Sequence, residues 1–399
     1  MNVLVISEQW WPEGTGGILA SHLIANILRD SGFELTVVHG TRQPKIVRGI
    51  NYIYTELLNV RNKYKLWINC MLLVRESWFL KVMHEYDAIY IPRYCYPLIP
   101  MAEKLGKKVI VHLHDYQPVS YNAVVFNEAR ERSFLNADDI RFELLEHNSA
   151  LRAFGALSAP ANALCRKWVS EVDVMICVSK RQSEIISNRA PELAYKIKVV
   201  YNPLPETPPL EEKFVNPTFT FAGGGSYIKG FQIFVQASLN VLKKGKNASF
   251  MFAGGLRGFK QHHMKLLERL NGSHMGNFRL LGRLPYEDVI RLYSRSHAVL
   301  VPSISEEPLP YVVMEAMAVG TLPLASRIGG IPEIVEGTYA EGMLFEPGSV
   351  EELVDRMESV LALSNEQIKE IGFKLRETVM KRFNPETIKA SLIEAFSSE

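Results

Sequence analysis

The stretch that decides the fold is Ala298-Val-Leu-Val-Pro-Ser-Ile-Ser-Glu-Glu-Pro-Leu-Pro-Tyr-Val-Val-Met-Glu-Ala-Met-Ala-Val-Gly320. Its first four residues are apolar without alternation, which is typical of a strand buried on both faces of a parallel sheet. Pro308 and Pro310 suit the first turn of a following helix, where the N–H that proline lacks is not needed. A strand, a loop and a helix in this order predict one unit of a doubly wound α/β sheet.

Short apolar runs of the same kind alternate with helix-like stretches along the whole chain. The predicted strands are 2–6, 34–39, 88–92, 107–113, 172–178, 197–201, 218–222, 248–253, 277–281, 297–301 and 322–325. The alternation breaks at Asn202-Pro-Leu-Pro-Glu-Thr-Pro-Pro-Leu210, because its four prolines exclude a helix or a central strand. The sequence therefore predicts two Rossmann-like, doubly wound domains, 1–205 and 206–382, with a site between them at the carboxyl ends of the strands.

Composition limits the function classes. The 399 residues are 47% hydrophobic and 22% charged, the balance of a folded globular protein. Lys and Arg (45) nearly match Asp and Glu (43), which argues against nucleic acid as the main partner. No run is long and apolar enough for a membrane span, and 2–6 resembles a strand rather than a secretion signal. We therefore expect a cytoplasmic protein, with its four scattered cysteines as reduced core thiols.

Two motifs at predicted strand ends of the first domain point to a ligand. Gln9-Trp-Trp-Pro-Glu-Gly-Thr-Gly-Gly17 connects a strand to a helix, and its glycines allow a ligand to approach backbone N–H groups. An ordinary turn explains the glycines equally well. In Val109-Ile-Val-His-Leu-His-Asp115, His112 and His114 lie two residues apart and face the same side of a strand. His112 suits the core and His114 a contact with a ligand hydroxyl or a proton transfer; two histidines alone are weak evidence for a metal.

Two further motifs lie in the second domain. In Phe219-Thr-Phe-Ala-Gly-Gly-Gly-Ser-Tyr-Ile-Lys-Gly230 a strand runs into a glycine loop with Lys229, a combination that attracts phosphate. The spacing is neither that of a Walker loop nor that of a dinucleotide fingerprint. In the deciding stretch, Glu307 lies before the predicted helix and Glu315 about one turn inside it. Two carboxylates there suit hydrogen bonds to sugar or ribose hydroxyls, although a capped helix with solvated glutamates would look the same.

With these residues in view, the chain resembles the GT4-type (group 1) retaining glycosyltransferases. The resemblance rests first on Glu307-x7-Glu315 followed by Ala-Met-Ala-x-Gly, and it continues in order along the chain. Further matches are Pro12…Gly16-Gly17, Leu113-His114-Asp115, Val172–Lys180, Lys196–Asn202, Leu281–Glu287, Gly329-Gly-Ile-Pro-Glu333 and Glu341–Gly348. The resemblance implies the GT-B fold: two Rossmann-like domains facing a cleft, with the C-terminal helix, 383–399, returning to the N-terminal domain.

The resemblance also implies roles. The domain 1–205 would bind the acceptor and 206–382 a nucleotide-diphosphate sugar. Catalysis would depend on Glu307, His114 and Lys229. The donor would be bound by Gly16, Gly17, Gly224, Gly225, Gly282, Arg283, Glu315 and the backbone amides of Leu309, Tyr311 and Val312. No metal and no further cofactor is implied. Two residues depart from the family pattern: Gly224 stands where an arginine is usual, and Pro310 where a glycine is usual, so one cation and one N–H are missing.

The reaction implied is transfer of a sugar to a hydroxyl of a lipid, saccharide or other glycan, with retention of anomeric configuration. A non-catalytic nucleotide-sugar binding protein on the same fold is an alternative, motivated by Gly224 and Pro310, and a sugar-nucleotide epimerase is another. Segment 61–86 carries apolar residues, Trp67 and Trp78 between basic residues. Peripheral contact with the cytoplasmic face of a membrane is one interpretation of this segment, and a helix covering the sheet is the other.

Overall fold

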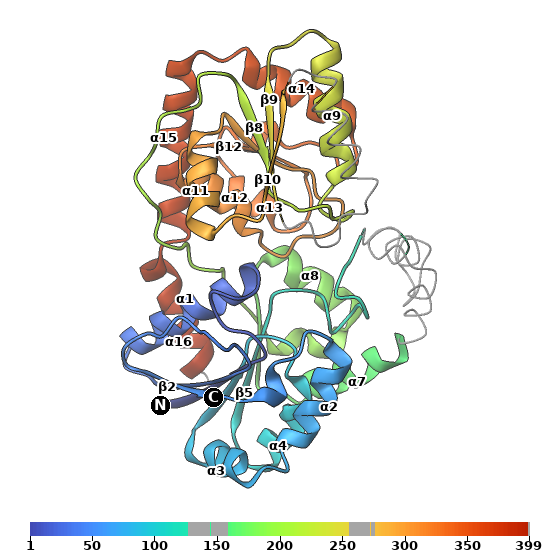
Figure 1. Ribbon diagram of the computed structural model, residues 1–399. Coiled ribbons are helices and arrows are strands. Elements are labelled where there is room, and N and C mark those ends of the chain that lie inside the picture. The colour runs from blue at the N-terminus through green and yellow to red at the C-terminus, as the bar shows by residue number, and fades with distance from the viewer. Residues whose placement is uncertain (127–143, 145–158, 255–271, 273–275, 398–399) are drawn as a thin grey trace. The chain divides into compact units, whose positions relative to one another are not determined.

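The computed structural model describes residues 1–126, 144, 159–254, 272 and 276–397. The chain forms two compact units, each built on its own parallel sheet (Figure 1). The first unit consists of Met1–Val124, Ser158–Pro205 and Phe383–Glu399, and the second of Val125–Leu157 and Glu206–Arg382. The chain thus passes to the second unit after Pro205, where the proline-rich stretch lies, and returns to the first at Phe383.

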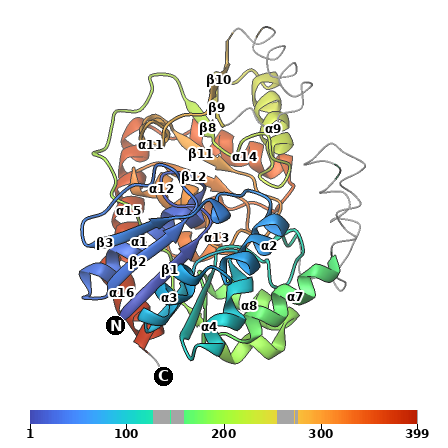
Figure 2. The ribbon, with the colours of Figure 1, turned by 60° about the horizontal axis from the view of Figure 1, so that its bottom comes forward.

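The first unit contains a seven-stranded sheet in the order β3-β2-β1-β4-β5-β6-β7, and all neighbours are parallel. The strands are β1 (Asn2–Ser7), β2 (Glu34–His39), β3 (Ile50–Tyr54), β4 (Ala88–Ile91), β5 (Lys108–Leu113), β6 (Val174–Cys177) and β7 (Ile197–Val199). Figure 2 shows β3, β2 and β1 side by side at one edge. The order reverses between β1 and β4, and the carboxyl ends of strands at such a switch point form a ligand crevice.

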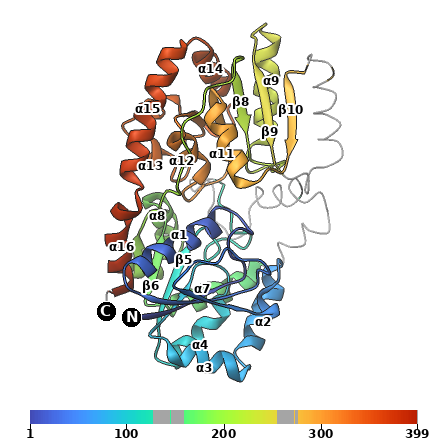
Figure 3. The same cartoon turned by 60° about the vertical axis from the view of Figure 1, so that its left-hand side comes forward.

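The second unit repeats this plan with five parallel strands in the order β10-β9-β8-β11-β12. They are β8 (Thr218–Phe221), β9 (Ser249–Ala253), β10 (Phe278–Gly282), β11 (Ala298–Val301) and β12 (Leu322–Ala325). Figure 3 shows β8, β9 and β10 side by side together with α9 (Phe231–Lys243). Phe234 of α9 stacks on Phe221 of β8 at a centroid distance of 5.0 Å. Here the switch point lies between β8 and β11.

Helices connect the strands in both units. The first unit has α1 (Gly16–Asp30), α2 (Lys63–Leu73), α3 (Ser77–Glu85), α4 (Ile99–Lys104), α7 (Ala159–Ser170), α8 (Lys180–Arg189) and α16 (Pro385–Ser397). The second has α9, α11 (Tyr286–Arg295), α12 (Tyr311–Ala318), α13 (Ile331–Val335), α14 (Val350–Leu361) and α15 (Asn365–Arg382). Short 3-10 turns are Glu56–Leu58, Tyr96–Leu98, Pro191–Lys196 and Glu341–Met343.

Helix α16 completes the core of the first unit. Its buried face consists of Ile388, Leu392, Ala395 and Phe396, which join residues of β1, β2 and β4 in one hydrophobic cluster. Phe396 makes an edge-to-face contact with Tyr90 of β4 at a centroid distance of 5.1 Å. Full burial of apolar side chains such as these stabilises a fold by about 1.5–3 kcal/mol each, so α16 is an integral part of this unit.

The two-sheet α/β architecture predicted from the sequence is confirmed, and each of the eleven predicted strands is present within two residues of its expected limits. The prediction missed β3 at the edge of the first sheet. Asn51 and Tyr54 of this strand are exposed, so the run lacks the continuous apolar character of a central strand. The four cysteines are free and buried, as expected.

Candidate active site

Two loops of the second unit meet at its switch point. The loop after β8 carries Lys229 and the loop after β11 carries Glu307; because these parallel strands are neighbours, both loops leave the same sheet edge. Lys229 Nζ donates to Glu307 Oε1 at 2.6 Å, and Ser303 Oγ donates to the same oxygen at 2.8 Å. The Lys229 side chain is 40% exposed and that of Glu307 is 10% exposed. A charged pair with an accessible ammonium group therefore lies at the place where this fold binds ligands.

Glycines fix the path of both loops through backbone contacts. Gly230 adopts φ +76°, and a Cβ atom there would lie 1.8 Å from the carbonyl oxygen of Pro302. Gly329 adopts φ +58°, and its Cβ would lie 2.0 Å from the carbonyl oxygen of Glu307. The N–H of Gly330 donates to that carbonyl at 2.8 Å. A side chain cannot be accommodated at either glycine without moving the loops, so these glycines are part of the site.

Helix α12 presents its N-terminus beside the Glu307 loop. Pro310 is the N-cap residue, and among the described residues no side chain caps the helix. Leu309 and Tyr311 are buried, and Val312 is half-buried. The first amides of a helix carry partial positive charge and have no partner within the helix. The arrangement suits an anion, with Pro310 contributing no N–H.

Glu315 lies on the second turn of α12 in a buried position. Its Oε1 accepts a hydrogen bond from the Tyr286 hydroxyl at 2.8 Å, a partner that no sequence pattern indicated. Burial raises the pKa of Glu315 to about 7, and the hydrogen bond from Tyr286 opposes this shift. A buried carboxyl group with a pKa near neutrality changes its hydrogen-bonding capacity within the physiological range.

The other glycines predicted to bind the donor surround the ends of β8, β9 and β10. Gly224 adopts φ +66°, and no atom of the described residues lies within 4 Å of a Cβ built there. A Cβ at Gly254 would lie 2.7 Å from Gly224 Cα, so the two loops touch through their backbones. The N–H of Gly254 donates to the carbonyl of Gly282 at 2.8 Å. Gly225 is half-buried in the first of these loops, and Arg283 is exposed beside Gly282.

In the first unit, His114 lies against the glycine turn that begins α1. A Cβ atom at Gly17 would lie 3.0 Å from His114 Cβ, and Gly16 is the first residue of this helix. The His112 and His114 rings stack with centroids 4.4 Å apart, which confirms that they share one side of the strand. Neither ring nitrogen of His114 has a hydrogen-bond partner within the described residues. Burial lowers the pKa of His114 well below its ordinary value, so this imidazole is neutral and holds two unused polar atoms.

His112 and Tyr90 lie on the interior side of His114. His112 Nδ1 is 2.8 Å from the Tyr90 hydroxyl, and burial lowers the pKa of His112 to about 3. This agrees with the core role expected of His112. The stacked pair is thus held from the interior by β4, while Gly17 leaves room for His114 at the other side.

A buried group of charges at the same sheet edge was not predicted from the sequence. Arg93 Nε contacts Glu8 Oε1 at 2.9 Å, linking the ends of β4 and β1 across the switch point. Tyr94 donates to Asp115 Oδ2 at 2.5 Å. Burial raises the pKa of both Glu8 and Asp115, and Arg93 opposes the shift in each. Glu8 Oε2 has no partner in the described part of the chain. Strand order was the available signal, because it brings these two strand ends together.

The predicted site residues therefore fall into two groups. Gly16, Gly17 and His114 gather in the first unit, and the other predicted residues gather around the switch point of the second. Within the described ranges, no three His, Cys, Asp or Glu side chains are placed to hold a metal ion.

Comparison with known proteins finds a family to which this part of the chain is similar. Residues 210–375 match the family model described as "Glycosyl transferases group 1". Over this segment the chain is similar to the group 1 glycosyl transferases. The matched segment contains the Lys229 and Glu307 loops, α12 and the Gly329 turn, so the family's region coincides with the site described in the second unit.

Relatives and solved structures extend the similarity beyond this segment. Spore coat protein SA of Bacillus subtilis (strain 168) is 23% identical over 65% of this chain and 73% of its own. One component of the phosphatidylinositol N-acetylglucosaminyltransferase of Homo sapiens is 23% identical over 90% of this chain and 68% of its own. The crystal structure of Anabaena Alr3699/HepE in complex with UDP and glucose matches with a TM-score of 0.70 at 18% identity, covering 100% of both chains. The fold is GT-B.

Proposed function

We propose that this protein is a retaining glycosyltransferase, which transfers a sugar from a nucleotide-diphosphate sugar to a hydroxyl acceptor without a metal ion. The observation that supports this most directly is the Lys229–Glu307 pair at 2.6 Å beside the N-terminus of α12. A half-exposed cation and a helix N-terminus suit a diphosphate, and carboxylates nearby suit sugar hydroxyls. The second unit would accordingly bind the donor and the first unit the acceptor.

The proposed chemistry follows from where charge develops. As the bond between the anomeric carbon and the diphosphate breaks, positive charge grows on the sugar and negative charge on the leaving group. Lys229 and the α12 amides stabilise the diphosphate, the role that a metal has in other transferases. The acceptor oxygen forms its bond on the face that the diphosphate leaves, and its proton passes to a diphosphate oxygen. Retention of configuration follows from this same-face geometry.

The other predicted residues receive roles by position. Glu307 would accept a hydrogen bond from the donor sugar, and Glu315 from the ribose. His114 would contact the sugar through a neutral ring nitrogen. Gly224, Gly225 and Gly282 would bring backbone close to the nucleotide, with Arg283 beside the base. Gly16 and Gly17 would approach the phosphate.

A nucleotide screen tests the donor site first. We would measure thermal unfolding with UDP, GDP and ADP, with their sugar conjugates, and with and without a chelator. A ligand at ~100 times its dissociation constant stabilises a protein by roughly 2.7 kcal/mol. We expect one nucleotide to stand out and the chelator to have no effect. UDP is the first choice, because the similar Anabaena structure contains UDP and glucose. Loss of the shift on chelation would contradict the metal-free proposal.

A transfer assay then separates this function from its alternative. Gly224 and Pro310 remove one cation and one N–H from the family pattern, which favours a protein that binds the nucleotide sugar without transferring it. With the donor identified by the screen, NMR of the reaction with saccharide and lipid-linked acceptors reports both transfer and anomeric configuration. A product of inverted configuration would contradict the retaining mechanism. Donor binding with no product from any acceptor would support the non-catalytic alternative.

A further inference from the structure

Helix α2 in the first unit is apolar on both of its sides. Leu66, Trp67, Cys70 and Leu73 are buried against the unit. On the opposite side, Ile68, Met71 and Leu72 are 59%, 44% and 42% exposed. Together with Lys65, these three residues follow the three- and four-residue spacing of a single helix face. We call Lys65, Ile68, Met71 and Leu72 the α2 outer face.

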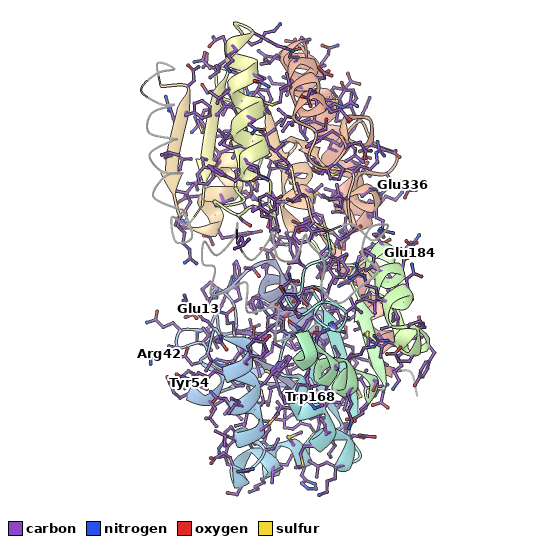
Figure 4. All side chains as sticks on the ribbon, turned by 90° about the vertical axis from the view of Figure 1, so that its right-hand side faces the viewer. Glu13, Arg42, Tyr54, Trp168, Glu184 and Glu336 are labelled. Atoms are coloured by element: carbon purple, nitrogen blue, oxygen red, sulfur yellow. The ribbon has the colours of Figure 1, made fainter. Side chains whose placement is uncertain are left out.

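Several contacts hold this helix firmly in place. The Asn62 side chain caps its N-terminus by accepting hydrogen bonds from the N–H groups of Tyr64 and Lys65. Trp67 donates to the carbonyl of Tyr94 at 3.1 Å and packs edge-to-face on Trp168 of α7 at 5.2 Å (Figure 4 labels Trp168). The exposed apolar side chains are therefore presented on a fixed helix. A helix that is apolar on all sides is normally buried on all sides. We therefore expect another molecule to cover the α2 outer face.

The charge around the outer face indicates which partner this is. Arg61 and Arg75 flank the helix, and Arg61 is exposed, as is Lys65 on the face itself. The sequence from 61 to 75 contains no acidic residue, and neither does that of the neighbouring α7, 159–170; the nearest acidic residue in the chain after α2 is the exposed Glu76, the N-cap residue of α3. A second copy of the chain would bring two basic rims together, which like-charge repulsion opposes. An anionic surface that accepts apolar side chains between its charges matches both properties.

We propose that the α2 outer face docks the first unit onto an anionic lipid bilayer, with Ile68, Met71 and Leu72 at the acyl boundary and Arg61, Lys65 and Arg75 among the headgroups. The contact is peripheral, since no helix of the described ranges combines the length and apolar character that a bilayer crossing needs. Membrane docking would add a partner to the proposed glycosyltransferase. The docking proposal can fail or hold independently of that function, because lipid binding is measured without a sugar nucleotide.

Vesicle flotation with the full chain tests the proposal. We expect flotation with phosphatidylcholine vesicles that contain about 30% phosphatidylglycerol, little with pure phosphatidylcholine, and weakening as salt shortens the screening length to about 3 Å near 1 M. Two double variants should each lower vesicle binding by about tenfold or more. One combines Ile68→Ser with Leu72→Ser, and the other combines Lys65→Glu with Arg75→Glu. Equal flotation of the wild type and both double variants would overturn the proposal.

Matched controls come from the second unit. Phe373 and Met380 are exposed apolar residues of α15, and Lys244 and Lys246 are exposed just after the end of α9. Phe373→Ser with Met380→Ser and Lys244→Glu with Lys246→Glu should leave flotation unchanged; a matching loss would overturn the assignment to α2. The nucleotide-induced thermal shift, measured on every variant, separates lipid binding from donor binding and from misfolding. The proposal would also be overturned if the wild type did not float but formed a dimer that the α2 variants abolish. That result would show that a second copy of the chain covers the α2 outer face.

Discussion

The two units share the doubly wound plan, yet their candidate sites consist of different chemical groups. Each reverses its strand order at a switch point, and each places its candidate residues at the strand ends there. The second unit relies on backbone: Gly230 and Gly329 allow main chains to touch, and the start of α12 supplies amides. The first relies on buried side chains, with stacked histidines and the Glu8–Arg93 pair. The comparison teaches that one fold can build a candidate site from fixed backbone amides or from buried titratable side chains.

This difference predicts that acid will affect the first unit most. Burial lowers the pKa of His22 and His39 to about 4 and that of His112 to about 3, whereas the described part of the second unit contains one such group, His297, at about 4. Below the unfolded pKa of about 6.5 the unfolded chain binds protons that the folded chain excludes, so stability falls as pH falls. At pH 5 each such histidine lowers the free energy of unfolding by about 2 kcal/mol relative to neutral pH.

Carboxyl groups sharpen the contrast. Glu315 in the second unit has its pKa raised to about 7, so that unit gains stability as pH falls from 7 toward 4.5. Glu8 and Asp115 offset part of the loss in the first unit. Hydrogen exchange of the whole protein at pH 7 and pH 5 checks this, since it reports each unit separately. Equal loss of protection in both units would break the comparison.

In the second unit we expect the largest effect on activity from Lys229. Lys229→Met removes the cation that Glu307 positions, and the transfer rate should fall by about 100- to 1000-fold, the loss typical of removing one group that stabilises developing charge. The thermal shift with the donor nucleotide should shrink as well. Lys244→Met, at an exposed lysine just after α9, is the matched control and should behave as wild type. An unchanged rate in Lys229→Met would remove this residue from the mechanism.

Loss of the Tyr286–Glu315 hydrogen bond should have a smaller effect, a pH-dependent change in nucleotide affinity. Because ionised Glu315 accepts hydrogen bonds at both oxygens, nucleotide affinity should rise as pH rises through about 7. Tyr286→Phe removes a bond that favours the ionised form, so it should raise the pKa of Glu315 and weaken binding at pH 7 by about tenfold. Titration calorimetry across pH 6 to 8 measures both. A pH profile that is flat in both proteins would exclude ionisation of Glu315 from binding.

The smallest effect expected is that of Gly17→Ala in the first unit. The new methyl group would press on His114, which must shift by a few tenths of an ångström. We expect the transfer rate to fall by several-fold, up to about tenfold, and nucleotide binding to weaken with it, because Gly17 is proposed to approach the donor phosphate. Gly342→Ala is the control, because a Cβ there meets no atom within 4 Å in the described part of the chain. An unchanged transfer rate in Gly17→Ala would remove the contact between Gly17 and His114 from the mechanism.

The same difference explains what could be predicted from the sequence. Loops that require glycine, or a proline before a helix, leave marks in the sequence, and Lys229, Glu307 and Glu315 were singled out from such marks. Glu8, Arg93 and Tyr286 carry no local mark. Each is an ordinary residue whose importance appears only when strand order or helix packing brings its partner near. Continuous apolar runs identified the central strands, while the edge strand β3, with exposed Asn51 and Tyr54, had no such run.

The return of α16 to the first unit has a consequence for folding during synthesis. Four of its residues belong to the core around β1, β2 and β4, yet in the chain they follow the entire main segment of the second unit. On the ribosome, the first unit emerges early but cannot close its core until the second has been synthesised. The main segment of the second unit, Glu206–Arg382, can fold while the first unit waits with the apolar groove that α16 fills still open. A nascent chain stalled before Phe383 would therefore expose this groove and be a natural client for chaperones.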